Sequence, residues 1–369
     1  MKIINERSNF IYNFHIITHE QLDYIIDFET QKILNLEFKK YNVQHYPIKW
    51  EASSIKKIRN LLNGFELVKN IKKNHNPIAV ITLGSVAASF AYLYSKVISL
   101  NIIAHTFEPH SKFLLETGFW NKTSLGYLFL NYLEKKVVKN AYCIMTGTNH
   151  YKKVILDLNP NANVIVVPSN VDETQFQINS TLRNDIRKKL NIEQQTVFVY
   201  LGKFGGIYYN EEIIEFFSII KNNIENAFFL VLTPNSKDSI ELLFQKYKIE
   251  KEYYHINKIP YSEVPQYLNA SDIGIIAIPP TPSQKFRSPI KVGEYLLCGL
   301  PYVICRGISE DDDCATINKV GVVLENFNVT SIEEKLIDIK KLLEQDIPNL
   351  QERCRVTGIN YREIGRAHV

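Results

Sequence analysis

The alternation of short apolar runs with longer amphipathic stretches constrains the fold of this chain more than any other feature. The amphipathic stretches of the second half have helical periodicity and lie at 210–222, 236–247, 262–269, 289–298 and 331–344. The apolar runs expected as strands are 196–201, 227–233, 253–257, 272–278, 301–305 and 320–324. Because strands that alternate with helices form parallel sheets with helices on both faces, this half is predicted to be one doubly wound α/β domain.

The first half repeats this alternation less regularly. Strands are expected at 14–18, 78–83, 101–107, 142–146 and 164–167, with helices between them. Segment 164–176, VIVVPSNVDETQF, ends a strand at a proline and continues into turn-forming residues, which is typical of a linker. We therefore predict two Rossmann-like doubly wound domains, 1–170 and 171–345, which face a ligand-binding cleft at the carboxyl ends of their strands. Residues 346–363 are expected to begin a C-terminal helical region.

Composition and local patterning exclude several classes of protein. With 45% hydrophobic and 22% charged residues in 369, the chain has the balance of a soluble protein. Residues 78–95 are uncharged and long enough to span a bilayer, but Gly84 and Ser85 divide them, which favours a strand, a turn and a helix with Ser85 as N-cap. The five cysteines show no CxxC pairing and are predicted to be buried free thiols.

Positive charge is concentrated in the first half. Residues 1–172 hold 20 Lys and Arg against 13 Asp and Glu, whereas the remainder holds 23 against 26. The first-half lysines indicate either solvated helix faces or contact with an anionic membrane surface. No nucleic acid partner is expected, because no nucleic-acid-binding motif accompanies them. We expect a cytoplasmic protein that lies peripherally at the inner membrane.

One stretch, KFRSPIKVGEYLLCGLPYVIC at 285–305, places two charges in an otherwise apolar helix and strand. Pro289 is tolerated in a first helical turn, and the free amides around Ile290 and Lys291 make an anion site with the helix dipole. Lys291 adds a full charge, and Glu294 follows about one turn later, where its carboxylate can accept two hydrogen bonds from a ribose diol. The residues alone indicate either a nucleotide site or a surface Lys–Glu pair.

Three segments resemble GT-B glycosyltransferases of family GT4, the glycosyl transferases group 1. They are VPSNVDETQF in the linker, EVPQYLNASDIGIIAIP at 263–279 and SPIKVGEYLLCGLPYVI at 288–304, which resembles the SPxKxxEYLxxGxP variant of the family signature. The resemblance covers roughly residues 14–345 and implies the GT-B fold and transfer of a sugar from a nucleotide sugar. It implies that the donor is bound by Glu294, Lys291, Lys203, Gly205, Gly206, Ser288, Pro289, Ile290 and Arg287.

Two parts of the donor site deserve comparison with the family pattern. Most members carry a second glutamate facing the sugar, where this chain has Phe286, so Lys285 and Arg287 are expected to serve the phosphates and the sugar is not predicted. The Gly-rich turn in YLGKFGGIYYNEE, 200–212, fits the family loop in which a basic residue, here Lys203, meets the diphosphate. Its glycines would let the backbone approach a phosphate, although a tight turn without a ligand is the other interpretation.

The first domain supplies candidates for chemistry in HTFEPHSKF, 105–113, which follows a predicted strand. The resemblance implies a histidine near the sugar on this loop, so His110, and then Glu108, are the candidate catalytic residues, with His105 a candidate sugar contact. Glu310, in GISEDDD, is a further candidate sugar contact, although its acidic run 310–313 also fits a solvated loop. No metal and no cofactor is assigned, because the metal-binding DxD motif belongs to a different glycosyltransferase fold.

The expected function is transfer of a sugar from a nucleotide-sugar donor to a glycan or lipid-linked acceptor. We expect a retaining, metal-independent reaction in bacterial surface polysaccharide synthesis. Two alternatives stay open: a nucleotide-sugar 2-epimerase of the same fold, and a non-catalytic protein that binds nucleotide sugars.

The two ends of the sequence differ from the family pattern. Only MKIINERSNFIYN precedes the first predicted strand, which is too short for the strand, Gly-containing loop and helix that family members place there. IGRAHV, 364–369, resembles a translated sequencing adapter. We therefore expect a fragment clipped at both ends, whose first domain lacks its first β–α unit.

Overall fold

The structure is a computed structural model that describes residues 13–21, 28–50 and 54–362. It divides into two compact units, one formed by residues 1–105 with 140–142 and the other by residues 106–139 with 143–369. The predicted domain boundary near residue 170 stays a prediction. The expected missing β–α unit also stays a prediction, and the adapter-like segment 364–369 lies outside the described residues.

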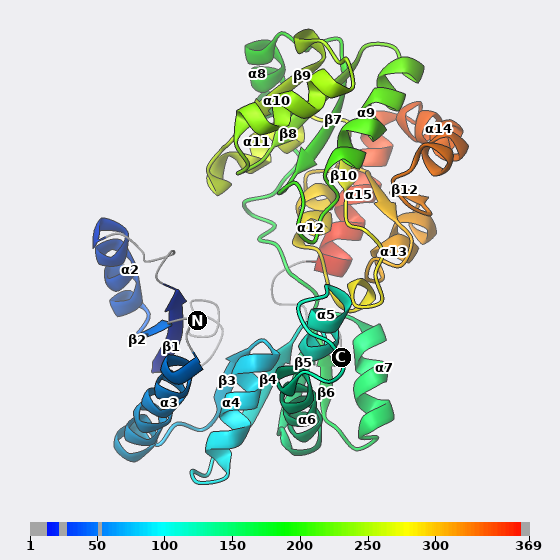
Figure 1. The fold of residues 1–369 in the computed structure, drawn as a ribbon. Coiled ribbons are helices and arrows are strands. Elements are labelled where there is room, and N and C mark those ends of the chain that lie inside the picture. The colour runs from blue at the N-terminus through cyan, green and yellow to red at the C-terminus, as the bar shows by residue number, and fades with distance from the viewer. Residues whose placement is uncertain (1–12, 22–27, 51–53, 363–369) are drawn as a thin grey trace. The chain divides into compact units, whose positions relative to one another are not determined.

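The first unit contains two pairs of parallel strands. β1 (Phe14–Gln21) pairs with β2 (Val43–Trp50), and β3 (Val80–Leu83) pairs with β4 (Ile102–Thr106). Its helices are α2 (Phe28–Lys40), α3 (Ser54–His75) and α4 (Ser85–Ser95), as Figure 1 shows. Strand β2 is absent from the sequence-based expectation, because its Pro47 cannot donate to a ladder. In a two-stranded sheet both strands are edges, so Pro47 is accommodated opposite Thr18.

Residues 78–95 form a strand, a turn and a helix, as predicted. Strand β3 is followed by Gly84 and then by α4. The N-cap position is taken by Gly84, with φ 89° and ψ 156°, and not by Ser85, which is the first helical residue. Within the described residues, no helix combines the length and the hydropathy that crossing a membrane requires.

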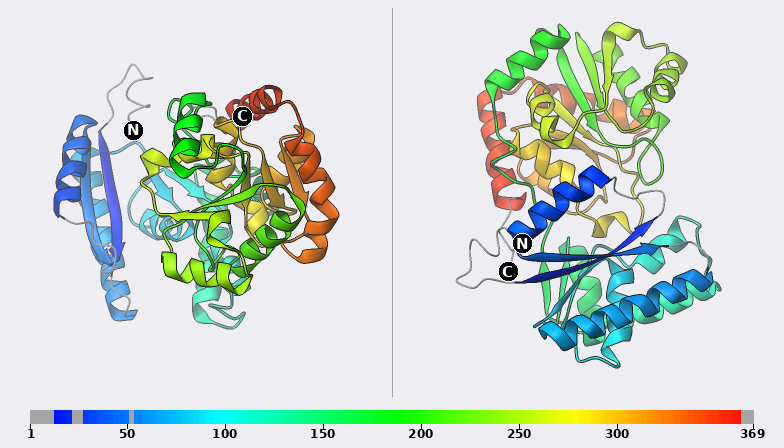
Figure 2. Two further views of the ribbon diagram at one scale, coloured as in Figure 1. Left: turned by 90° about the horizontal axis from the view of Figure 1, so that it is seen from above. Right: turned by 90° about the vertical axis from the view of Figure 1, so that its left-hand side faces the viewer.

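The second unit begins with α5 (His110–Glu116) and α6 (Leu125–Asn140), followed by the parallel strands β5 (Cys143–Thr146) and β6 (Val164–Val166) around α7 (Asn149–Leu158). A six-stranded parallel sheet follows, in the order β12-β11-β10-β7-β8-β9, with helices on both faces (Figures 1 and 2). Its strands are β7 (Thr196–Leu201), β8 (Ala227–Leu232), β9 (Tyr254–Asn257), β10 (Ile273–Ile276), β11 (Tyr302–Cys305) and β12 (Gly321–Leu324). Its helices are α8 (Ser180–Leu190), α9 (Glu211–Asn223), α10 (Lys237–Lys246), α11 (Val264–Asn269), α12 (Ile290–Leu297), α13 (Asp311–Ile317), α14 (Val329–Leu343) and α15 (Ile347–Arg362).

The predicted doubly wound domain is confirmed in this sheet. Every strand predicted after residue 195 is present, with ends within two residues of the prediction. The central strands are buried on both faces, which is why they are continuous apolar runs in the sequence. The five cysteines are free and buried, as predicted. The strand order reverses between β7 and β10, and in open α/β sheets such a reversal places the ligand site at the adjacent carboxyl ends.

The acidic run at 310–313 is not a solvated loop, and that alternative is wrong. Residues from Asp311 onward form α13, and Asp311 and Asp312 are buried. A carboxylate oxygen of Asp312 accepts the N–H of Gly307 at 2.8 Å, and Asp311 pairs with Arg362. Acidic side chains are favoured at a helix N-terminus, where the dipole and free amides stabilise them, so the run begins a helix.

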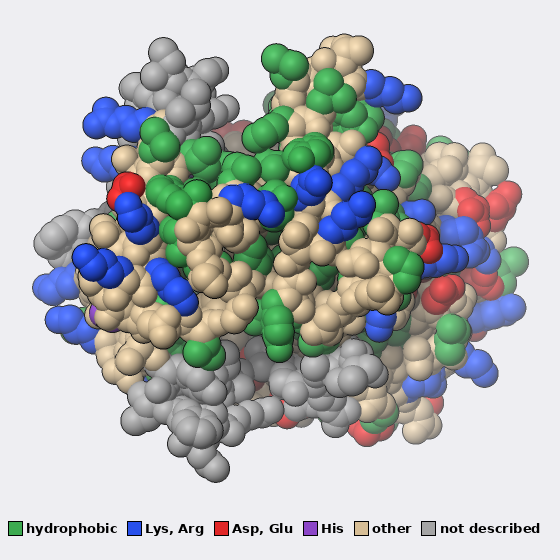
Figure 3. All heavy atoms as spheres, turned by 90° about the horizontal axis from the view of Figure 1, so that it is seen from below, with side chains coloured by type: hydrophobic (Ala, Val, Ile, Leu, Met, Phe, Trp, Pro, Cys, Tyr) green, Lys and Arg blue, Asp and Glu red, His purple; other side chains and the backbone are tan. Residues whose placement is uncertain are grey.

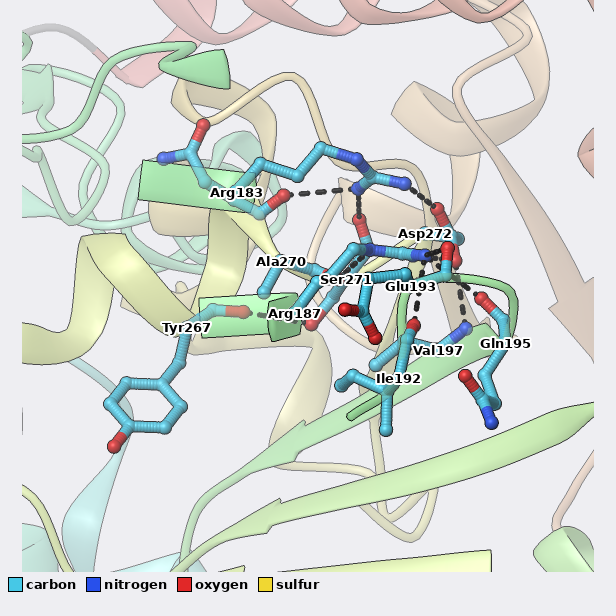
Figure 4. Close-up of polar contacts among 11 residues, drawn as sticks. Arg183, Arg187, Ile192, Glu193, Gln195, Val197, Tyr267, Ala270, Ser271 and Asp272 are labelled. Atoms are coloured by element: carbon cyan, nitrogen blue, oxygen red, sulfur yellow. Dashed lines mark hydrogen bonds and ion pairs between the residues drawn. The ribbon is translucent and has the colours of Figure 1, made fainter. Parts of the chain in front are cut away.

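Helix α8 is attached to the sheet by a cluster of two arginines around Asp272, the residue before β10 (Figure 4). The Asp272 carboxylate accepts hydrogen bonds from Arg183 Nη2 at 2.6 Å, Arg187 Nη2 at 2.5 Å and the N–H of Val197 at 2.7 Å. Arg187 is buried and also donates to the backbone carbonyls of Ala270, Ile192, Glu193 and Gln195. Burial lowers the pKa of Arg187, and the charge of Asp272 opposes this effect.

Replacement of Arg187 by Met is expected to destabilise the protein by about 3–5 kcal/mol, because it leaves Asp272 and several carbonyls without their donor. Urea denaturation followed by circular dichroism measures this change. The matched control is Arg306→Met, which removes an exposed pair with Glu325 and should stay within about 0.5 kcal/mol of the parent. A loss below about 1 kcal/mol for Arg187→Met would contradict this account.

Candidate functional site

The candidate site lies at the carboxyl edge of the six-stranded sheet, where β7 and β10 are neighbours. The Gly-rich turn at 202–210 leaves this edge after β7, and segment 277–289 leaves it after β10. The two segments are joined directly, since the N–H of Tyr209 donates to the carbonyl of Ala277 at 3.1 Å. Because parallel neighbours end at the same edge, the Gly-rich turn and the start of α12 come together.

Helix α12 is fixed against the sheet by Tyr295. The Tyr295 ring packs on Gly274 of β10 so closely that a Cβ at this position would lie 2.4 Å from the ring carbon Cδ2, so only glycine fits there. The hydroxyl of Tyr295 accepts the N–H of Leu201 and donates to the carbonyl of Ile275, both at 3.3 Å. These contacts hold the N-terminus of α12 at the carboxyl edge.

The N-terminus of α12 has the features of an anion site. Pro289 is the N-cap residue, with φ −63° and ψ 116°, and so lies one position before the first turn in which it was predicted. Its carbonyl accepts the N–H of Val292 at 3.2 Å. The N–H groups of Ile290 and Lys291 precede the first possible helical acceptor, and the helix dipole is positive at this end. Together they can bind a phosphate.

Glu294 is buried one turn into α12, with only 3% of its surface exposed. Burial raises the pKa of this carboxyl, while the charge of Lys291 and a hydrogen bond with the Tyr261 hydroxyl oppose the rise. Tyr261 lies in the short helix η3 (Tyr261–Glu263), and no sequence signal identified it. Because a carboxylate offers about four acceptor positions, Tyr261 leaves capacity for the two hydroxyls of a diol.

Lys291 reaches from α12 toward the Gly-rich turn. Its Nζ lies 5.8 Å from the ring centroid of Tyr208, and its Cε would lie 3.4 Å from a Cβ placed on Gly202. Gly205 and Gly206 adopt φ of 79° and 69°, a region that favours glycine, and a Cβ on either would meet no atom within 4 Å. The turn therefore presents open backbone beside a lysine.

Two further candidates for donor binding are Lys203, on the Gly-rich turn, and Ser288, just before α12. Lys203 is exposed on the turn, whose shape is supported by Asn235, because its side-chain oxygen accepts the N–H of Phe204 at 3.1 Å. Ser288 is bonded within the protein: its hydroxyl oxygen accepts the N–H of Ser169 at 3.0 Å, and its carbonyl accepts from the Ser169 hydroxyl at 2.6 Å. Ser288 thus supports the start of α12 through its own polar contacts.

Arg287, Glu108 and His110 form one polar network. The Glu108 carboxylate lies 2.9 Å from His110 Nδ1 and 3.3 Å from Arg287 Nε. The Arg287 guanidinium stacks over Phe113, 4.1 Å from the ring centroid. Burial would raise the pKa of Glu108, but His110 and Arg287 outweigh it and hold this pKa below its ordinary value. The carboxylate is therefore ionised, and it orients the imidazole by accepting from Nδ1.

Two further positions bear on recognition of the sugar. Phe286, which stands where the family carries a second glutamate, is buried against Tyr151, with ring centroids 5.3 Å apart. The Glu310 carboxylate accepts two hydrogen bonds from Asn149 at the start of α7. The backbone N–H of Asn149 donates at 2.7 Å and its side-chain amide at 3.2 Å. The Glu310 carboxylate is therefore held in place, and Lys285 lies exposed with its Nζ 5.1 Å from the Phe286 ring centroid.

His105, the remaining candidate of the loop, belongs to the first unit. It lies on β4, and burial lowers the pKa of its imidazole. Within the described part of the chain, no three or more His, Cys, Asp or Glu side chains converge as metal ligands. The expectation of a metal-independent reaction stays a prediction.

Comparison with known proteins supports the resemblance seen in the sequence. Residues 182–360 match the family model described as glycosyl transferases group 1. A search among curated protein sequences finds no match.

Several solved structures are similar in fold. Sucrose-phosphate synthase from Thermosynechococcus elongatus has a TM-score of 0.68 and 13% identity, with 95% of each chain covered. HepE of Anabaena, solved in complex with UDP-glucose, has a TM-score of 0.67 and 9% identity, also over 95% of each chain. WaaG, a glycosyltransferase involved in lipopolysaccharide biosynthesis, has a TM-score of 0.63 and 15% identity over 94% of this chain and 95% of its own.

The sheet topology, the family match and these folds agree with one another. The chain is a glycosyltransferase of the GT-B fold, and its residues 182–360 match the glycosyl transferases group 1 family.

Proposed function

We propose that this glycosyltransferase transfers a sugar from a nucleoside diphosphate sugar to a glycan or lipid-linked acceptor, with retention and without a metal ion, in bacterial surface polysaccharide synthesis. One observation carries the donor assignment: the buried Glu294 and the half-buried Lys291 lie on the first turn and a half of α12, beside an open Gly-rich turn. The binding of UDP-glucose by HepE supports a nucleotide-sugar donor, and the role of WaaG in lipopolysaccharide biosynthesis supports the acceptor class.

In the proposed complex, each group of α12 has one task. The ribose hydroxyls donate to Glu294, and the diphosphate lies against the amides of Ile290 and Lys291. Lys291 and Lys203 add positive charge as the bond to the sugar breaks and the diphosphate leaves. Fixed positive groups stabilise charge that develops in the transition state more than charge already present in the ground state, which is the source of catalysis here.

His110 is proposed to contact the reacting sugar. Because Glu108 accepts from Nδ1, the opposite ring nitrogen, Nε2, is directed away from this carboxylate and can bind a sugar hydroxyl. Arg287, through its contact with Glu108 and its stacking on Phe113, keeps the carboxylate ionised and in place. His105 and Glu310 are proposed as additional contacts to the sugar.

The acceptor class also calls for contact with a membrane, and α6 carries side chains suited to it. Four exposed apolar residues recur at helical spacing: Leu125 (84% exposed), Leu128 (49%), Phe129 (57%) and Tyr132 (55%). The same stripe continues into Lys135, Lys136 and Lys139, while Leu130, Leu133, Val137 and Val138 face the core. Seen from below Figure 1, hydrophobic and basic side chains are interspersed on this side of the molecule (Figure 3).

Such a stripe fits an anionic lipid surface. An interfacial helix buries aromatic and aliphatic side chains at the boundary between headgroups and acyl chains, and each nearby lysine adds about 1 kcal/mol of attraction. We therefore propose that α6, and not the sum of lysine pairs in the first half, makes the membrane contact.

The donor assignment predicts the effect of changing Glu294. In a thermal-shift screen of UDP-, GDP- and dTDP-sugars, the true donor should stabilise the parent protein by about 2.7 kcal/mol at roughly 100 times its dissociation constant. Glu294→Ala should weaken its binding about tenfold to several-hundredfold, because each charge-assisted hydrogen bond is worth about 1.5–3 kcal/mol. Calorimetry measures the affinity.

The control for this experiment is Glu225→Ala, an exposed carboxylate before β8 at the opposite edge of the sheet. Equal donor affinity in Glu294→Ala and the parent would remove the ribose assignment. Release of free nucleoside diphosphate that depends on an acceptor would support transfer over epimerisation. Binding of the donor without turnover would favour a non-catalytic protein.

The role of His110 predicts a separation of turnover from binding. His110→Ala should lower kcat by about tenfold to a hundredfold, the value of one hydrogen bond strengthened in the transition state, with little change in donor affinity. Steady-state kinetics alongside calorimetry measures both. His150→Ala, an exposed histidine on α7, should leave both unchanged. If His110→Ala kept the parent kcat, His110 would have a structural role only.

The membrane proposal predicts a specific loss of vesicle binding. Leu125→Ser with Phe129→Ser should abolish co-sedimentation with vesicles of phosphatidylglycerol, and Lys135→Glu with Lys139→Glu should weaken it most at low salt. Matched controls are Ile337→Ser, an exposed apolar residue on α14, and Lys72→Glu with Lys73→Glu on α3. Equal sedimentation of the parent with neutral and anionic vesicles, or loss only in the α3 variant, would overturn it.

A further inference from the structure

Arg362, at the end of α15, is wholly buried, with 0% of its surface exposed. It is the largest of the fully buried side chains in the described residues, and it is charged. A guanidinium is placed in a protein interior only where several acceptors compensate for the loss of water. The acceptors of Arg362 therefore indicate its structural role.

The acceptors of Arg362 come from three separate segments. One terminal nitrogen, Nη1, donates to the carbonyl of Ser169 at 3.2 Å and to the hydroxyl of Ser288. The other, Nη2, pairs with the carboxylate of Asp311. The backbone carbonyl of Arg362 also accepts the N–H of Val171 at 2.8 Å. One side chain thus joins the segment after β6, the lead-in to α12 and the start of α13.

Close packing of two helices places Arg362 at this junction. A Cβ on Gly293 of α12 would lie 2.8 Å from Val171 Cγ2 and 3.0 Å from Arg362 Cβ. A Cβ on Gly358 of α15 would lie 3.0 Å from Leu296 Cβ. The two glycines let α12 and α15 approach to the distance at which the guanidinium reaches all three segments.

Two of the three joined segments adjoin candidate site residues. Ser288 comes two positions before Ile290, whose amide belongs to the anion site. Asp311 follows Glu310, and the same loop is tied to the donor segment because the N–H of Ser309 donates to the carbonyl of Gln284 at 3.2 Å. Movement of Arg362 would therefore shift the N-terminus of α12 and the Glu310 loop together.

The buried ion pair of Arg362 and Asp311 is poorly suited to a purely stabilising role. Burial raises the pKa of Asp311 and Arg362 opposes it, while burial would lower the pKa of Arg362 and Asp311 outweighs that effect. Arg362 Nε is buried and has no acceptor among the described residues. Buried ion pairs often contribute no net stability over apolar replacements, so geometry is the better explanation for this one.

We propose that Arg362 is a positioning residue of the donor site, which sets the N-terminus of α12 relative to the Glu310 loop without touching the donor. The anion-binding consequence rests on the proposed function, whereas the structural consequence does not. The residue was not indicated by any sequence motif, because its partners lie 51 to 193 positions away.

The test compares Arg362→Met and Arg362→Lys with the parent chain by hydrogen exchange, without ligand. Arg362→Met should exchange at least about tenfold faster in peptides covering 167–172, 284–294 and 305–314, with β7 and β8 unchanged. Arg362→Lys should recover part of the protection. Arg353→Met is the matched control, since Arg353 lies on the same helix but bonds the carbonyl of Lys319 and the side chain of Gln345, neither of which is an acceptor of Arg362.

A second readout uses inorganic pyrophosphate, the group common to nucleotide-sugar donors. Arg362→Met should bind it about tenfold more weakly than the parent, and Arg353→Met should bind it equally well. If Arg362→Met does not fold, Ser288→Ala and Asp311→Asn should each reproduce part of the local exchange. Exchange that rises equally across the whole sheet, or no change at 284–294, would overturn the proposal. Failure of the parent to bind pyrophosphate would count against the proposed function, while the exchange result would still decide the role of Arg362.

Discussion

The reversal of strand order between β7 and β10 is the constraint on which the site depends. In a parallel sheet all carboxyl ends lie at one edge, and helices that follow two neighbouring strands in opposite directions leave a space above that edge. The Gly-rich turn after β7 and the start of α12 after β10 meet there, joined by the Tyr209–Ala277 hydrogen bond. The joint role proposed for Glu294 and Lys291 depends on this arrangement.

The two buried carboxylates of the site differ in their environment. Glu108 has cationic neighbours in Arg287 and His110, so its pKa is held low and it is ionised before any ligand arrives. Glu294 is buried with less compensation, and its pKa is raised. A carboxyl such as Glu294 gains hydrogen-bond donors when a ligand binds, whereas a carboxylate such as Glu108 already has its donors. This difference suits Glu294 to ligand binding and Glu108 to holding an imidazole.

Buried arginines join distant segments in two places, with different consequences. Arg187 bonds Asp272 and a set of backbone carbonyls far from the carboxyl edge, so it attaches a helix to the sheet. Arg362 bonds the lead-in to α12 and the segment after β6, so its geometry bears on the candidate donor site. The planar guanidinium has five donors in a fixed arrangement, which lets one side chain set several loops at once where lysine would not.

The sequence by itself determined the second half of the fold and the position of the candidate site on α12. Strands such as 227–232 are apolar throughout because both faces are buried, and the Ser-Pro-Ile-Lys stretch starts a helix for local reasons. The sequence pattern did not predict β2, because Pro47 is unusual within a strand. It also did not predict α13, because its acidic run resembled a loop. Only the tertiary structure decided that Tyr261 reaches Glu294, that Glu108 joins Arg287 to His110, and that Arg362 joins three segments. These contacts link residues far apart in the chain, and their energies depend on burial, which no local pattern encodes.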